Sequence, residues 1–181
     1  MGNRKEEILI VALIAGELYI TKGALYRHYK SKRDIFDCIV QRMEQRDGEQ
    51  AEEYDMPQEE KEKMPEQYEA VSLDDFVEYS KSMFEYWTED DFASSFRKML
   101  TIEQFRSEEM QKLYQQYLVA GPASYVKALF ESIGIVNAKD KAARFYAVMH
   151  FYYSLYDGAA DKEKVKVEFV SAIKSLVQDL A

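Results

Sequence analysis

Proline and glycine are scarce in this chain of 181 residues, which contains three prolines and seven glycines. Because both residues interrupt regular structure, long stretches without them favour a helical protein over a sheet protein. Hydrophobic residues make up 47% of the chain, which is enough for a sizeable core and argues against wholesale disorder. We therefore expect an all-α protein.

Cysteine is almost absent, since Cys38 is the only one in the sequence. A single cysteine excludes an internal disulfide and is typical of proteins in a reducing cytoplasm. Cys38 lies in the apolar run Ile35-Phe36-Asp37-Cys38-Ile39-Val40, so we expect it in the core rather than acting as a nucleophile.

Long hydrophobic runs are also missing. Residues 8–15 read ILIVALIA, and eight residues cannot cross a bilayer core of about 30 Å. The run lacks the cleavage site of a signal peptide. We expect a soluble, cytoplasmic protein with no membrane partner.

Signatures of catalysis and metal binding are absent from the sequence as well. The two histidines, His28 and His150, are far apart, and together with one cysteine they give no zinc-ligand spacing. No nucleophile–base pair and no phosphate-binding glycine loop stands out. We therefore expect no metal, no cofactor and no enzymatic activity, although an enzyme remains an open alternative.

Charge is distributed unevenly. The whole chain has a formal charge of -9, yet residues 1–35 contain seven cations and four acids, a net charge of +3 that leaves -12 for the rest. Between Lys22 and Arg33 there are five cations and no acid, with Tyr26, His28 and Tyr29 among them. Cations bind phosphate by charge, and tyrosine and histidine add hydrogen bonds. A basic end on an acidic body is what a DNA-binding head would give, although ordinary variation of surface charge is the alternative.

Residues 14–36 read IAGELYITKGALYRHYKSKRDIF. This segment resembles the DNA-reading half of the TetR family of bacterial transcriptional regulators. The family pattern is a helix that begins Ile-Ala, a tight turn, and then Ser/Thr-Lys-Gly-Ala/Thr-Leu-Tyr-x-His-Phe/Tyr followed by x-x-Lys and an apolar pair. The rest of the chain agrees with the family only in being helical, acidic and of the right length.

The resemblance implies an N-terminal helix-turn-helix DNA-binding domain in residues 1–43, which include the start of a connecting helix. Residues 44–181 would form a helical domain for effector binding and dimerisation. Thr21, Lys22 and Gly23 would approach base edges, while Tyr26, His28 and Lys32 would hold phosphates. Arg27 also faces outward in this helix and belongs to the expected DNA-binding set.

The resemblance further implies a homodimer formed by the last two helices, with two heads on successive major grooves of palindromic, double-stranded operator DNA. The expected function is that of a repressor released from its operator by a small-molecule effector.

The first helices depart from the family pattern in two ways. Leu13 directly precedes Ile14, where family members have a longer stretch that completes the first helix and its turn. The head is therefore shortened, either in the natural protein or because this sequence omits residues, and we favour omission because both flanks match. Tyr19 occupies a turn position where the family usually has glycine. If the shortening is real, the alternative function is a helical dimeric ligand-binding or interaction protein with a non-functional DNA head.

Hydrophobic spacing predicts the following helices: 4–13, 14–19, 22–29, 32–54, 73–87, about 89–105, 107–133 with a kink or break at Gly121-Pro122, 137–156, and about 161–180. Thr21, as well as Ser72 with Asp75 three residues on, are expected N-caps, and Gly134 is an expected C-cap. Residues 44–69 contain eleven acids and three cations, and we expect a solvated helix end and a mobile linker there. Residues 145–156 are apolar almost all round, so a second subunit is expected to cover one side.

Aromatic residues make up 14% of the chain and could line a pocket between helices. The alternative for any one of them is ordinary core, and His150 in particular is typical of a hydrogen-bonded core histidine. An aromatic pocket in an acidic body would suit an apolar, aromatic or cationic effector. The expected effector-binding residues are Tyr79, Met83, Trp87, Phe96, Met99, Phe105, Tyr114, Tyr117, Tyr125, His150 and Tyr153.

Overall fold

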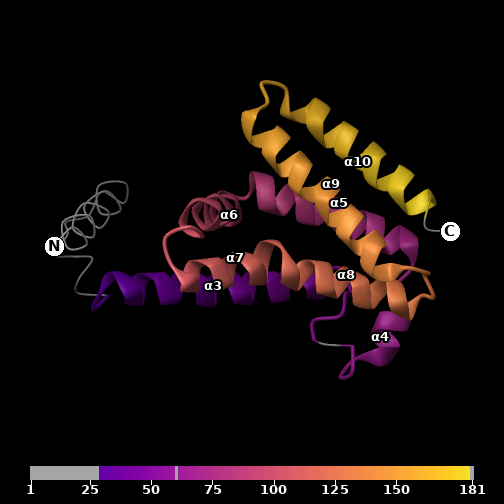
Figure 1. Ribbon diagram of the computed structural model, residues 1–181, viewed down its shortest axis with the longest axis horizontal. Coiled ribbons are helices and arrows are strands. Elements are labelled where there is room, and N and C mark those ends of the chain that lie inside the picture. The colour runs from indigo at the N-terminus through magenta and orange to yellow at the C-terminus, as the bar shows by residue number, and fades with distance from the viewer. Residues whose placement is uncertain (1–28, 60, 180–181) are drawn as a thin grey trace. The chain divides into compact units, whose positions relative to one another are not determined.

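The computed structural model describes residues 29–59 and 61–179, and every regular element in these ranges is an α-helix. The prediction of an all-α protein is confirmed for this part of the chain. The helices, labelled in Figure 1, are α3 (Lys32–Glu53), α4 (Pro65–Ala70), α5 (Leu73–Glu89), α6 (Asp91–Glu103), α7 (Glu108–Leu118), α8 (Ala120–Ser132), α9 (Ala138–Gly158) and α10 (Lys162–Gln178).

The chain divides into two compact units, residues 1–49 and residues 50–181. In the described part of the first unit, Ser31 caps α3, because its hydroxyl accepts a hydrogen bond from the Asp34 amide at 3.1 Å. Tyr29 and Ile39 pack against the buried side chain of Ile35. Cys38 lies outside this small cluster and is exposed, so the expectation that it is a core residue is wrong.

The second unit is a helical bundle in which α9 packs against α5, α8 and α10. Helix α5 also contacts α6 and α10, and α7 contacts both α6 and α8. The short α4 lies beside α8 (Figure 1). Two pairs of consecutive helices that are far apart in the sequence, α5 with α6 and α9 with α10, therefore meet in one bundle.

Aromatic rings form much of the core of the second unit. Phe84 on α5 stacks on Phe169 of α10 with 4.1 Å between ring centroids, and on Tyr153 of α9 at 5.5 Å. One end of α5 repeats the arrangement, where Phe76 meets Phe130 at 5.2 Å and Phe145 at 4.8 Å. Each such pair is worth about 0.5–1.5 kcal/mol beyond the area that it buries. The aromatic pairs thus tie α5, α8, α9 and α10 together.

Two predicted helix caps are confirmed. Ser72 and Asp75 form a reciprocal capping box at the start of α5, in which the Ser72 hydroxyl accepts from the Asp75 amide at 3.1 Å. Gly134 ends α8 with a φ of 77°, and the Ile135 amide donates to the Phe130 carbonyl at 2.8 Å. Such a left-handed residue closes a helix by satisfying its last carbonyls, and glycine adopts it without steric cost.

The predicted linker needs correction, whereas the interruption predicted near Gly121-Pro122 is found. Residues 65–70 form α4 instead of a linker, because Pro65 is at the start of the helix and Tyr68 is buried, with 2% of its surface exposed. The predicted helix 107–133 is interrupted at Val119, two residues before Gly121, which agrees with the break expected near Gly121-Pro122. A Cβ atom on Gly121 would collide with the carbonyl group of Gln116, so the tight junction between α7 and α8 depends on this glycine.

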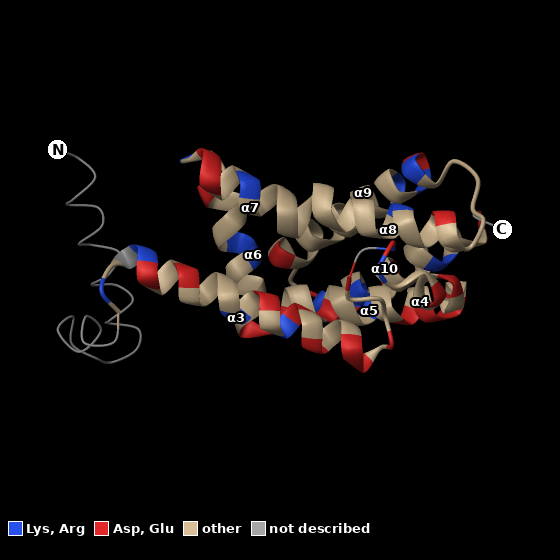
Figure 2. Cartoon of the chain, turned by 90° about the horizontal axis from the view of Figure 1, so that it is seen from below, with Lys and Arg blue, Asp and Glu red and all other residues tan. Residues whose placement is uncertain are grey.

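Residues 145–156, which are apolar almost all round, are only partly covered in α9. One side is buried against the bundle through Phe145, Met149 and Tyr153, whereas Phe151 and Leu155 remain 60% and 37% exposed. The middle of α9 has no charged residue (Figure 2). Within the described ranges, no helix has both the length and the apolar character that crossing a membrane requires.

Candidate functional site

The residues expected to bind DNA are almost all outside the described part of the chain. Thr21, Lys22, Gly23, Tyr26, Arg27 and His28 precede residue 29. Lys32 is the first residue of α3. Their roles stay predictions that rest on the sequence.

Seven of the eleven residues expected to bind an effector fall into two separate clusters in the second unit. The first, which we call the Arg97 cluster, lies where α5, α6, α7 and α9 meet. It contains five of the predicted residues around a buried arginine: Trp87, Phe96, Tyr117, His150 and Tyr153, with Arg97 and its partner Asp157. The rings of Phe96 and Tyr117 meet edge to face at 5.2 Å.

Arg97 holds three elements of the Arg97 cluster together. Its Nη1 and Nη2 donate to the two carboxylate oxygens of Asp157 at 2.9 and 2.8 Å, and its Nε donates to the Trp87 carbonyl at 2.9 Å. The guanidinium also lies over the Tyr153 ring, 5.0 Å from its centroid. The Trp87 carbonyl belongs to the last turn of α5, where helical carbonyls have no partner within the helix. Arg97 therefore caps α5 while it ties α6 to the end of α9.

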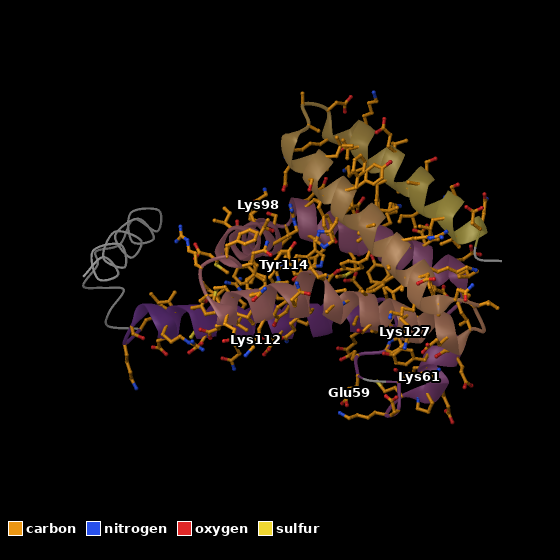
Figure 3. The ribbon with its side chains drawn as sticks, viewed as in Figure 1. Glu59, Lys61, Lys98, Lys112, Tyr114 and Lys127 are labelled. Atoms are coloured by element: carbon orange, nitrogen blue, oxygen red, sulfur yellow. The ribbon has the colours of Figure 1, made fainter. Side chains whose placement is uncertain are left out.

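Electrostatics favour the charged form of Asp157. Burial by itself would raise the pKa of this carboxyl, but the hydrogen bonds and the charge of Arg97, with a smaller contribution from Lys98, outweigh burial and lower the pKa. The Lys98 ammonium is 3.4 Å from Asp157 and lies at the surface (Figure 3). The Asp157 side chain is 29% exposed and that of Arg97 only 7%. Water therefore reaches the ion pair from the Asp157 side.

His150 forms a hydrogen bond to a second helix end in the same cluster. Its Nε2 forms a short hydrogen bond with the carbonyl of Leu118, the last residue of α7. Because a carbonyl only accepts, Nε2 must be the protonated nitrogen of the ring. His150 is thus a hydrogen-bonded histidine inside the bundle, packed edge to face against Tyr146 and Tyr153.

A charged network continues from this end of the bundle onto α10. The Tyr156 hydroxyl donates to Glu89 at 2.9 Å, and Lys166 bridges Glu89 and Glu163 at 2.9 and 2.7 Å. The hydrogen bond from Lys166 lowers the pKa of Glu89, whereas burial and the bond to Glu89 raise the pKa of Tyr156 to about 12. This network links the ends of α5 and α9 to the start of α10.

The second cluster, which we call the tyrosine cluster, lies between α4, α5 and α8. It consists of Tyr54, Tyr68, Tyr79 and Tyr125. Tyr68 and Tyr125 meet edge to face at 5.9 Å, and Tyr54 and Tyr79 are paired at 5.9 Å. The Tyr68 hydroxyl donates to the carbonyl of Glu59 at 3.0 Å, and Glu59 is labelled beside α4 in Figure 3.

Four predicted effector-binding residues have no described contact with either cluster. Met83, Met99 and Tyr114 are half-buried. Phe105 is 86% exposed, so its expected place in a pocket needs correction. Helix α6 ends at Glu103, and Phe105 follows in the turn towards α7, where no element covers it.

An open pocket of about 600 Å³ lies elsewhere in the second unit. The turns before α5 and after α8 and the end of α10 line it, with Leu73, Ile133, Ile135, Lys141 and Asp179 among its residues. None of the predicted effector-binding residues lines this pocket. Within residues 29–59 and 61–179, no group of three or more histidine, cysteine, aspartate or glutamate side chains is arranged to hold a metal ion.

Sequence reasoning missed Arg97, although a signal for it exists. Ala93, Phe96, Arg97 and Leu100 are buried on α6 at the spacing of an apolar helix face, so an arginine stands where a core residue is expected. Tyr54 and Tyr68 were missed because they lie in the acidic stretch for which the sequence predicts a solvated helix end and a mobile linker.

Comparison of the chain with protein-family models, with curated protein sequences and with solved structures gave no significant match.

Proposed function

We propose that this protein is a TetR-like DNA-binding transcriptional regulator, a cytoplasmic homodimeric repressor that a small-molecule effector releases from its operator. The observation that carries the proposal is the ordered match from Ile14 to Phe36. The all-helical second unit is compatible with it. The acidic charge of the remainder also supports it, because DNA would be held by the basic N-terminal end alone.

The proposal assigns different tasks to two lysines of the head. Lys32 would contact phosphate only, so Lys32→Ala should weaken binding to all duplex sequences to a similar extent. Lys22 would reach base edges, so Lys22→Ala should also relax the preference for one sequence. Binding of a randomised duplex library by the wild type and both variants, at two salt concentrations, tests this assignment. Equal loss on selected and random DNA for both variants would count against base reading by Lys22.

Homodimerisation through α9 and α10 is part of the proposal. Phe151 on α9 and Val167 on the adjoining α10 are 60% and 70% exposed, and a second copy would cover them. Phe151→Glu should shift the protein from dimer to monomer in analytical ultracentrifugation. Ile102→Glu is the matched control, because Ile102 is an exposed apolar residue on α6. A wild type that is already monomeric at micromolar concentration, or equal effects of both changes, would contradict this interface.

Release by an effector requires that the effector binds one arrangement of the two heads more tightly than the other. A tenfold difference in affinity corresponds to about 1.4 kcal/mol of coupling. The aromatic residues of the second unit offer such an effector stacking and cation–π contacts.

A second candidate function is that of a helical dimeric ligand-binding or interaction protein whose head does not bind DNA. The direct junction of Leu13 and Ile14 favours it, because the head then lacks part of its first helix. The two functions differ in one result. A regulator enriches a palindrome from the duplex library with an affinity that falls as salt rises, whereas the alternative enriches none.

A further inference from the structure

The hydroxyl group of Tyr125 is a buried polar group in the tyrosine cluster. Its oxygen is buried and has no hydrogen-bond partner. Leaving such a group unsatisfied costs about 1–3 kcal/mol, and native proteins contain few of them. When one occurs, a bound water or a ligand is a common reason for it.

The surroundings of this hydroxyl are phenol rings contributed by separate segments. Tyr125 on α8 meets the ring of Tyr68 on α4, whose own hydroxyl donates to the Glu59 carbonyl. Tyr79 on α5 is near enough for its phenol to act on Tyr125, and Tyr54 pairs with Tyr79. The cluster therefore presents ring faces and edges from α4, α5 and α8, with one hydroxyl that has nothing to bind.

The protonation state of Tyr125 defines what it can offer. Burial raises the pKa of this phenol above its ordinary value, and Tyr79 and Tyr68 raise it further. The group therefore stays a neutral O–H at physiological pH, and a neutral phenol inside an apolar site donates its hydrogen bond to an uncharged acceptor well.

We propose that the tyrosine cluster is the effector site, and that it takes a planar aromatic compound with a hydrogen-bond acceptor, such as a ketone, that accepts from the Tyr125 hydroxyl. The rings of Tyr68 and Tyr79 pack against the body of the compound, and stacking of this kind favours flat molecules. Tyr54 is 36% exposed and Tyr79 is half-buried, so these two residues form the solvent-facing side of the cluster. The effector role rests on the proposed function, whereas the binding chemistry does not.

Two probes with the same aromatic body isolate the hydrogen bond. Naphthalene has no acceptor, and 2-acetylnaphthalene adds one carbonyl. Their binding is measured by equilibrium dialysis against the full chain, Tyr125→Phe and Tyr117→Phe. Tyr125→Phe keeps the ring and removes only the hydroxyl, and Tyr117→Phe makes the same change in the Arg97 cluster.

The expected result is that 2-acetylnaphthalene binds the wild type about three- to tenfold more tightly than Tyr125→Phe, the effect of one neutral hydrogen bond. Naphthalene should bind both proteins equally, and Tyr117→Phe should behave as the wild type does. The proposal is overturned if 2-acetylnaphthalene does not bind the wild type, if it binds Tyr125→Phe equally well, or if only Tyr117→Phe weakens it.

A DNA experiment separates this proposal from the proposed function. If the probe result is as expected but the protein selects no DNA, the site exists and the regulator is wrong. If DNA is selected but the probe result fails, the regulator stands and its effector binds elsewhere.

Discussion

The Arg97 cluster and the tyrosine cluster are built from similar aromatic residues, but they differ in how their polar groups are satisfied. In the Arg97 cluster the guanidinium and the His150 ring bind a carboxylate and the last carbonyls of two helices. In the tyrosine cluster the buried hydroxyl of Tyr125 has no partner in the described part of the chain. The first pattern is that of a structural contact, because the hydrogen bonds of Arg97 and His150 hold helix ends together. The second pattern leaves the Tyr125 hydroxyl as a hydrogen-bond donor for the proposed ligand.

The comparison also explains why many aromatic residues do not by themselves make a binding site. Trp87, Phe96 and Tyr153 are 5% exposed or less and surround an ion pair that is already complete. A ligand entering there would have to compete with an interaction inside the protein. The tyrosine cluster poses no such competition at Tyr125.

The largest expected effect is the loss of Arg97. Arg97→Met keeps much of the side-chain volume but leaves Asp157 and the Trp87 carbonyl without their donor. Removing one partner of a buried pair costs about 3 kcal/mol, and the free energy of unfolding in urea should fall by that amount. Arg106→Met is the control, because the Arg106 side chain in the ion pair with Glu103 is 59% exposed, and pairs at the surface contribute about 1 kcal/mol or less. Similar losses of stability in both variants would show that Arg97 does not hold these helices together.

The Arg97–Asp157 ion pair should also make stability depend on pH, and this effect is expected to be smaller. The pKa of Asp157 is lowered in the folded protein, so its contribution to stability is present above the unfolded pKa of about 3.9 and is lost as the pH falls through the folded pKa. Asp157→Asn should therefore destabilise the protein at pH 7 and make unfolding between pH 5 and pH 2 less dependent on pH. Urea titrations across this range measure the difference. In the Arg97→Met background the change should be much weaker, and an equal change there would contradict the assignment to this pair.

The next effect belongs to the tyrosine cluster. Tyr68→Phe removes the hydroxyl that donates to the Glu59 carbonyl, and one such hydrogen bond is worth about 1 kcal/mol. Chemical denaturation should show a loss of this size. No loss would mean that the bond does not fix α4 against the segment before it.

The smallest effect is the most informative within the tyrosine cluster. Tyr125→Phe removes a hydroxyl that has no partner, so the unfolding free energy should stay the same or rise by up to about 1 kcal/mol. The same urea experiment, run beside Tyr68→Phe, gives a direct contrast between a used and an unused phenol. A loss as large as that of Tyr68→Phe would reveal a hydrogen bond to Tyr125 and remove the reason to place a ligand there.

Local signals in the sequence predicted the helices of the second unit well. The capping box at Ser72, the glycine at position 134 and the apolar spacing of α5 all depend on residues a few positions apart. The joint at Arg97 depends on Asp157, sixty residues later, and no local pattern pairs them. The acidic composition of residues 44–69 concealed Tyr68, since one buried ring is enough to dock a short helix whatever the charge of its neighbours.

Predictions about single side chains were less reliable, because composition does not say which face of a helix is covered. Cys38 lies in an apolar run and is exposed, and Phe105 is an aromatic residue and is also exposed. The aromatic residues predicted for one pocket divide into two groups, because α5 contributes Tyr79 to one end of the bundle and Trp87 to the other. Tyr79 and Trp87 are eight residues apart on α5, which places them in different clusters. Only the tertiary structure shows which other residues each of them contacts.

One titration directly tests the proposed function of a dimeric DNA-binding regulator. The palindrome enriched from the duplex library, and a scrambled duplex of the same composition, are titrated with the purified protein at two salt concentrations, after its mass has been checked against 21.2 kDa. The account predicts two chains per palindromic duplex, much weaker binding to the scrambled duplex, and an affinity that falls steeply as salt rises. Equal and weak binding to both duplexes, by a protein of that mass, would contradict it.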